Sequence, residues 1–371
     1  MKRILEANES EHGCRESNEG SDGNRKRQPP VNRRRYDAVD QLDMHPIDKK
    51  RRPAELLKRF PPPDAAQLVG AREQHQEDAE PKEEEPVEKG PETQDGCFIF
   101  ADKSQMQVHK KTWAAKIAGM KLDDVVNWIV GTAAPPSEAK TEPETQMKCM
   151  IKAMGIKDPQ SVIIGKKDKY GYRDFGDQKG IWNSKFGGTF AGNFGAITEN
   201  ARKKCSSTLA ADKEWNMDKP SHKECWTKTL SADEKQREIL RTSSAPGISR
   251  HHWGTDVDLF STSPADFEKQ GGKYFDRFKW LTANAATYGF IQSFTATSAK
   301  ALAGTKDEKL GYLEERWHWS YWPIAQALVE FAKANEAKAE AALDAKWGTD
   351  AQYSYIKKNW KEFMFNVNQN P

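Results

Sequence analysis

The sequence has few cysteines, and none of them is arranged for metal binding. Its five cysteines are widely spaced among 371 residues, and none forms the CxxC pair that is typical of a thiolate zinc site. Cys205 and Cys225 could pair in an oxidising compartment, but the odd total and the wide scatter argue against a disulfide framework. We therefore expect neither a thiolate metal site nor a fold held together by disulfides.

Long apolar runs and a strong net charge are also missing. No stretch approaches the roughly 20 apolar residues of a membrane helix, so we expect no membrane span. The formal net charge of +3 is too small to indicate a nucleic-acid partner. Residues 1–8 turn polar too early for a classical signal peptide. If the target lies in the cell envelope or periplasm, we expect export by a non-Sec route.

Apolar residues are scarce in residues 1–95. Basic clusters at 25–27, 33–35 and 49–52 precede an acidic run, punctuated by proline, at 77–92. So little apolar surface cannot offset the entropy lost on ordering, which predicts a disordered, charged tail. The basic clusters could bind nucleic acid or act as an address that contacts a delivery machinery, and the alternative is a solvated tail.

The rest of the chain has the pattern of a folded α+β protein. We predict a small helical region of unknown role at 97–155 and the main domain at 156–371. Strands and helices alternate without βαβ regularity, which indicates a small antiparallel sheet flanked by helices. Residues 132–143 and 200–230 have the composition of a linker and an inserted loop. Strands are expected at 98–100, 161–165, 255–260, 290–294 and 316–321, and helices within 113–130, 146–154, 231–240, 272–287, 323–347 and 353–365.

Imidazoles and carboxylates concentrate in two segments some sixty positions apart. The first carries His251 and Asp258, seven residues apart across a glycine, and the second carries Glu315 and His318. A catalytic zinc site needs three protein ligands, an open position for water and a base. We predict one Zn²⁺ held by His251, Asp258 and His318, with Glu315 as the general base. Because Glu315 would face away from His318 in a regular strand, a bend must bring it back.

Arg173 supplies a cation that could meet a negative charge on a substrate. Its guanidinium could hold a substrate carboxylate or a developing oxyanion, and Gln178 could hold the guanidinium or contact the substrate. Taken alone, however, an arginine of this kind is more often a surface residue.

These residues carry a resemblance to a known family. The chain resembles the VanY/VanX-like zinc peptidases, a group of D-alanyl-D-alanine carboxypeptidases, dipeptidases and L-alanyl-D-glutamate endopeptidases. Their pattern is SxHxxGxxxD followed much later by ExxH, and residues 249–258 and 315–318 match it. Tyr172 and Arg173, followed by Gln178, are similar to the YR…Q element of the family. The resemblance covers roughly residues 160–335.

The resemblance implies the same ligands and base, and adds substrate-binding roles for Ser249, Tyr172 and Gln178. Where this chain has Asp256, many relatives carry alanine. We expect that carboxylate either to compete as a ligand or to bind a substrate amine, and His252 to lie outside the ligand set. The long insertion between Gln178 and Ser249 should reshape the cleft.

The prediction is a zinc-dependent peptidase that cleaves peptidoglycan stem peptides, foremost a D-alanyl-D-alanine carboxypeptidase. The alternatives are an L-alanyl-D-glutamate endopeptidase, either a lysin or a delivered effector, and a non-catalytic zinc-bearing module that binds the cell wall. Glu315 argues against the last alternative, because a binding module has no need of a base.

Overall fold

The computed structural model describes residues 90–165, 170–205, 209, 212–268, 271–295, 312–365 and 367–370. They belong to one unit that spans Pro81–Pro371. The predicted disordered tail, residues 1–95, lies outside the described residues except for its end. That end is part of a hairpin, so regular structure among the described residues begins at Glu92 and not near Cys97.

A small antiparallel sheet positions the two predicted metal segments. Its central strand is β7 (His318–Tyr321), with β5 (Asp256–Asp258) on one side and β6 (Phe290–Gln292) on the other. The register places Asp258 opposite His318 and Val257 opposite Trp319. Because side chains alternate along a strand, the polar members of these pairs share one face and the apolar members share the other. The α+β prediction with a small antiparallel sheet is confirmed.

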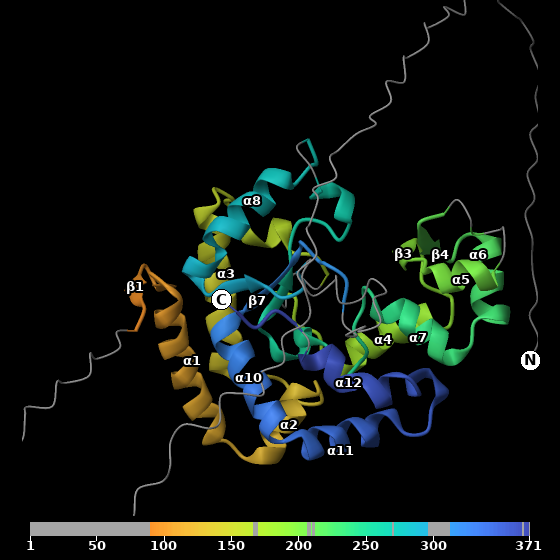
Figure 1. Ribbon diagram of the computed structural model, residues 1–371. Coiled ribbons are helices and arrows are strands. Elements are labelled where there is room, and N and C mark those ends of the chain that lie inside the picture. The colour runs from red at the N-terminus through yellow and green to blue at the C-terminus, as the bar shows by residue number, and fades with distance from the viewer. Residues whose placement is uncertain are drawn as a thin grey trace, which may run out of the picture. The chain divides into compact units, whose positions relative to one another are not determined.

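The N-terminal part packs against the body of this unit. A hairpin of β1 (Glu92–Gln94) and β2 (Cys97–Ile99) leads into α1 (Lys103–Ala118), α2 (Leu122–Ile129) and α3 (Ser137–Ala153). Helix α1 lies along α10 (Trp322–Ala334) (Figure 1). Trp128 donates a hydrogen bond to the carbonyl of Trp253, and Trp253 donates one to the carbonyl of Ile129. Helix α2 thus holds the turn that carries His251.

The prediction of a linker at 132–143 is wrong from residue 137 onward. Helix α3 begins there and contains Pro143 in its interior. Its buried residues recur at helical spacing through the proline, at Ala139, Pro143, Met147 and Met150. The apolar stripe therefore outweighs the local preference of proline to end a helix.

The prediction of an inserted loop at 200–230 is also wrong. Strands β3 (Asn193–Ala196) and β4 (Glu214–Asn216) pair, and α5 (Glu199–Lys204), α6 (Pro220–Glu224) and the turn Cys225–Thr229 gather around them (Figure 1). Phe194 and Trp215 both pack edge-on against Trp226, and all three residues belong to the hydrophobic core. Strands of three or four residues are too short to show an alternating pattern in a sequence.

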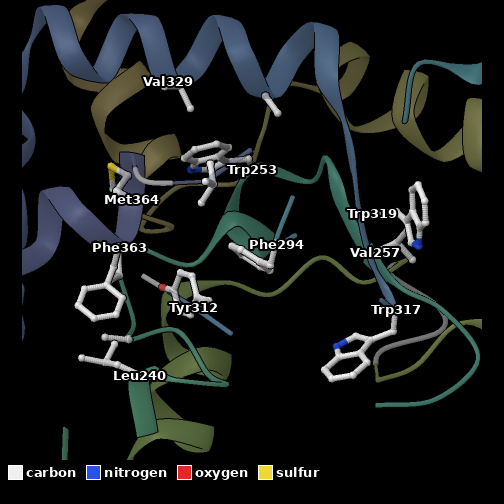
Figure 2. Packing of buried hydrophobic residues seen from close by; sticks show 14 of the residues in the cluster. Leu240, Trp253, Val257, Phe294, Tyr312, Trp317, Trp319, Val329, Phe363 and Met364 are labelled. Atoms are coloured by element: carbon white, nitrogen blue, oxygen red, sulfur yellow. The ribbon is translucent and has the colours of Figure 1, made fainter. Parts of the chain in front are cut away.

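The remaining elements largely follow the predicted pattern. They are α7 (Ala232–Leu240), α8 (Phe275–Asn284), α10, α11 (Glu336–Trp347) and α12 (Ile356–Phe365), whereas α4 (Phe175–Phe186) was not predicted. The long helix predicted at 323–347 is interrupted at Asn335. The strand predicted at 161–165 is wrong, since only Ile163 forms a single bridge, to Leu259, after the 3₁₀ turn Pro159–Val162. Figure 2 shows Trp253, Phe294 and Tyr312, from three separate segments, in the shared core.

Disulfides correct a further expectation. Cys97 pairs with Cys149 across 52 positions, and Cys205 pairs with Cys225 across 20. The cysteines are widely spaced in the sequence, which argued against disulfides. The fold nevertheless brings β2 next to α3, and the end of α5 next to the turn Cys225–Thr229, so both pairs meet. Cys14 lies outside the described residues. Within the described ranges, no helix has both the length and the apolar character to cross a membrane.

Candidate active site

The three predicted metal ligands converge from three adjacent elements. His251 lies on the 3₁₀ turn Arg250–Trp253, which Gly254 ends with a φ of +74°. Asp258 ends β5, and His318 begins β7 directly opposite it. One ligand atom from each residue lies within 4.8 Å of the others, and all three side chains are buried. The structure brings together the set that the sequence predicted.

Hydrogen bonds fix which ring nitrogen of each histidine faces the cluster. Nδ1 of His251 donates to the carbonyl of Gly171 at 2.9 Å, which leaves Nε2 toward Asp258 at 3.2 Å. Nε2 of His318 lies 3.2 Å from Asp256, and its Nδ1 faces Asp258 at 2.9 Å. A metal-binding imidazole commonly donates its second N–H to a carbonyl or a carboxylate in this way. The donor set of two imidazoles and one carboxylate therefore fits a zinc ion.

Burial and neighbouring charges shift the pKa values of the three residues in different directions. Burial alone would lower the pKa of His318, but its hydrogen bonds to Asp256 and Asp258 raise that pKa to about 9. Burial and the neighbouring Arg173 lower the pKa of His251, so this ring is neutral at pH 7. Asp258 stays ionised despite its burial, because the two histidines lower its pKa.

Asp256 does not reach the cleft. Its carboxylate accepts from Nε of Arg250 at 2.8 Å and lies behind His318. Arg250 in turn donates to Ser320 and lies 4.7 Å from the Trp253 ring centroid. These contacts hold the His318 ring. Sequence analysis did not assign a role to Arg250. Its position next to His251 in the sequence was the one feature that could have indicated such a role.

Glu315 lies beside the cluster because the chain bends before β7. The backbone N–H of His318 donates to the carbonyl of Glu315, and the backbone N–H of Glu315 donates to the carbonyl of Phe294. This turn brings a carboxylate oxygen of Glu315 to 3.7 Å from Nδ1 of His318. Burial raises the pKa of Glu315 to about 8. The predicted bend is thus present.

A cleft of about 610 Å³ opens over the cluster. Ser249 lines it, and its hydroxyl is buried without a hydrogen-bond partner among the described residues. Tyr172 and Asp256 instead line a separate cavity of about 10 Å³. The predicted site residues that line the large cleft are Arg173, Gln178, Ser249, His251, Asp258, Glu315 and His318.

The guanidinium of Arg173 points into the cluster. Its Nη2 lies 2.9 Å from Nε2 of His251 and 2.7 Å from Asp258, and its Nη1 donates to Gln178. Gln178 is fixed by its bond to the carbonyl of Ser244 at 2.7 Å. Both residues therefore border the cluster.

His252 lies outside the ligand set. It is fully buried, its Nδ1 donates to the carbonyl of Arg173, and its Nε2 accepts from the N–H of Gly247. Burial lowers its pKa to about 4, so the ring is neutral. It joins the Arg173 segment to the turn that carries His251.

Lys185 is a cleft residue that sequence analysis missed. It lies in α4, near the end of that helix, and is 7% exposed. Helix α4 was not predicted, although Asp174 is a suitable N-cap and accepts from the N–H of Asp177. Without that helix, nothing in the sequence assigned Lys185 to a buried wall.

The family model for VanY, D-alanyl-D-alanine carboxypeptidase, matches residues 138–324. The chain belongs to this family. The matched range is half of the chain and contains every residue of the site described above. It places the protein among hydrolases that act on peptidoglycan, as the resemblance predicted.

Individual relatives are more distant. An uncharacterized protein of Haemophilus influenzae is 27% identical over 133 residues, which cover 31% of this chain and 89% of that protein. A structure of the LdcB LD-carboxypeptidase is 17% identical, with 59% of this chain and 78% of that chain covered and a TM-score of 0.26. A structure of VanYB in complex with D-alanine-D-alanine is 16% identical, with 54% and 78% covered and a TM-score of 0.26. Family membership rests on the family model and not on these.

Proposed function

We propose that the protein is a zinc-dependent peptidase that removes the terminal D-alanine from peptidoglycan stem peptides. One observation carries this proposal: His251, Asp258 and His318 converge beside a buried Glu315 on the floor of a cleft. Family membership supplies the substrate class. Zinc would be held by Nε2 of His251, a carboxylate oxygen of Asp258 and Nδ1 of His318.

Glu315, Arg173, Gln178 and Ser249 have separate roles in the proposed reaction. Zinc, when bound, acts as a Lewis acid that polarises the scissile carbonyl and lowers the pKa of water. Glu315, whose carboxylate lies 3.7 Å from Nδ1 of His318, takes a proton from the attacking water and returns it to the leaving amine. Arg173 stabilises the negative charge that develops on the substrate, and Gln178 holds Arg173 in place. The unpartnered hydroxyl of Ser249 donates to the substrate.

The place of action is also a proposal. Two disulfides favour an oxidising compartment, so we propose that the protein acts in the periplasm or elsewhere in the cell envelope. Export by a non-Sec route, with residues 1–95 contacting the delivery machinery, remains a proposal about residues that lie almost entirely outside the described ranges.

Mass spectrometry of muropeptides tests the activity. Purified protein should remove one alanine from stem peptides that end in D-Ala-D-Ala, and a chelator should stop the reaction. Glu315→Gln should lower kcat by about 10²- to 10⁴-fold without loss of zinc. Glu340→Gln, on the exposed face of α11, is the matched control.

Other outcomes of this assay reassign the protein. Cleavage between L-alanine and D-glutamate would make it an endopeptidase. Equal behaviour of wild type and Glu315→Gln, with binding but no cleavage, would make it a cell-wall binding module.

A further inference from the structure

Lys185 brings a positive charge into the wall of the cleft. Its ammonium lies 4.8 Å from the ring centroid of Phe190 and 5.5 Å from that of Phe194, and it hydrogen-bonds with Ser243. Removing an ammonium from water is costly unless its charge is matched. Burial accordingly lowers the pKa of Lys185 to about 8.

The charge of Lys185 has no close counter-ion. Among the described residues, no carboxylate forms a salt bridge with it, and the hydroxyl of Ser243 is its one hydrogen-bond acceptor. Glu315 acts on it only through longer-range attraction, and Arg173 adds a second positive charge nearby. Since an ammonium has three N–H donors, donors remain for a ligand in the cleft.

Hydroxyl groups, of which that of Ser243 contacts the ammonium, line the same cleft as Lys185. Thr242, Ser243 and Ser244 all line the same cleft. Oγ1 of Thr242 is buried and has no hydrogen-bond partner among the described residues, as is also the case for Ser249. An ammonium beside free hydroxyls provides the donors that an anionic oxygen pair requires.

The rest of the cleft selects the kind of anion. Its lining carries four carboxylates, those of Glu214, Asp258, Glu314 and Glu315, and three cationic side chains, those of Arg173, Lys185 and Arg250, so the cleft has no excess of positive charge that would favour a multiply charged phosphate. A singly charged carboxylate, presented by a peptide that lies in the cleft, matches one ammonium.

We propose that Lys185, together with Thr242 and Ser243, binds a carboxylate of the peptide substrate. This inference rests on the proposed function and deepens it, because it names the group of the substrate, a carboxylate, that the cleft recognises. The carboxylate is either the C-terminal one or one on a side chain of the stem. Arg173, which lies at the metal cluster, then stabilises the negative charge that develops at the scissile bond and does not bind this carboxylate.

Binding measurements separate the two sources of the carboxylate. The full chain carrying Glu315→Gln, loaded with zinc, is titrated by calorimetry with three peptides that share one sequence. The first ends in D-Ala-D-Ala with a free carboxylate, the second is its C-terminal amide, and the third has its side-chain carboxylate amidated. Adding Lys185→Met should weaken binding by about 10- to 100-fold for peptides that retain the recognised carboxylate. It should change binding by less than about threefold for the peptide in which that carboxylate is amidated.

Two further variants serve as controls. Lys185→Arg keeps the charge and should retain most of the affinity. Lys235→Met removes another lysine that lies over a phenylalanine ring, that of Phe186, but outside the cleft, and should leave binding unchanged.

The inference and the proposed function fail in different ways. Equal weakening for all three peptides would mean that Lys185 acts through packing, and no weakening would mean that it has no role; either result overturns the inference. If wild type cleaves the stem peptide but Lys185→Met leaves peptide binding unchanged, only the inference fails. If none of the peptides binds or is cleaved, both fail.

Discussion

Two aspartates on one strand have different environments. Asp258 faces the cleft and shares its oxygens with both histidines, whereas Asp256 is buried between Arg250 and His318. Strand alternation predicted that they share a face, but not which one reaches the cleft. That difference depends on Arg250, whose burial follows from the turn that precedes β5.

Asp256→Asn tests whether Asp256 orients His318. Loss of the charge weakens the hydrogen bond to Nε2 of His318, so we expect zinc affinity to fall by about 10- to 100-fold. Competition with a chromophoric chelator measures it, and Asp276→Asn on the exposed side of α8 is the control. Unchanged affinity would contradict the orienting role.

The metal ligands could be read from the sequence because their types and spacing are specific. Lys185 could not, because an isolated lysine gives no sign of burial. Its position depends on α4, whose buried face consists of Gln178, Trp182 and Lys185 and is mostly polar. Hydrophobic periodicity does not reveal a helix of this kind.

At the scale of elements, the close approach of the segment before α4 to β5 shapes the site. Gly171 has a φ of +85°, and its carbonyl fixes the His251 ring. A Cβ at this position would lie 2.9 Å from the carbonyl oxygen of Asp256 and 3.3 Å from Cα of Val257. Nothing but glycine fits there without a shift of the backbone.

We expect Gly171→Ala to lower the free energy of unfolding by roughly 1–3 kcal/mol, from backbone strain and the clash with β5. Gly180→Ala is the matched control, because Gly180 lies within α4 with nothing within 4 Å of an added Cβ. The control should be neutral or slightly stabilising. Urea unfolding distinguishes the two, and equal stability of both variants would contradict the close approach.

Glu142 joins three elements through one carboxylate. It accepts from His109 and Trp113 of α1 and from Tyr321 at the end of β7. Burial would raise the pKa of Glu142, but these hydrogen bonds outweigh it and lower the pKa below 4.5. A lowered folded-state pKa stabilises the fold above the unfolded value, and this stabilisation is lost as pH falls through the folded value.

Glu142→Gln should therefore be less stable than wild type at pH 7, by roughly 1–3 kcal/mol. Its stability should also decline less steeply between about pH 5 and pH 3, since it lacks this titration. Thermal unfolding across that range measures both effects. Parallel pH profiles for the two proteins would contradict the account.

At the scale of the whole molecule, contacts between distant segments were the part that the sequence did not reveal. The hydrogen bonds from Trp128 to the carbonyl of Trp253 and from Trp253 to the carbonyl of Ile129 join residues 125 and 124 positions apart. Composition indicated helices before residue 155 but could not show that they hold the His251 turn. The Cys97–Cys149 disulfide was missed for the same reason, because only the fold brings these cysteines together, whereas the Cys205–Cys225 pairing had been considered.

Breaking the disulfides should destabilise the protein. Closing loops of 52 and 20 positions restricts the unfolded chain, and chain entropy predicts roughly 4 and 3 kcal/mol for the two bridges. Thermal unfolding of Cys97→Ser and Cys225→Ser variants, with and without reductant, measures the loss. A wild-type melting temperature that reductant leaves unchanged would contradict both bridges.

Metal content tests the central claim most directly. The zinc bound per chain is measured by elemental mass spectrometry after dialysis, for wild type, Glu315→Gln, His251→Ala and Asp258→Ala, with circular dichroism to confirm folding. The account predicts one zinc ion in wild type and in Glu315→Gln, and a folded protein with little or no zinc in the two ligand variants. A wild type without zinc, or ligand variants that bind as much as wild type, would contradict it.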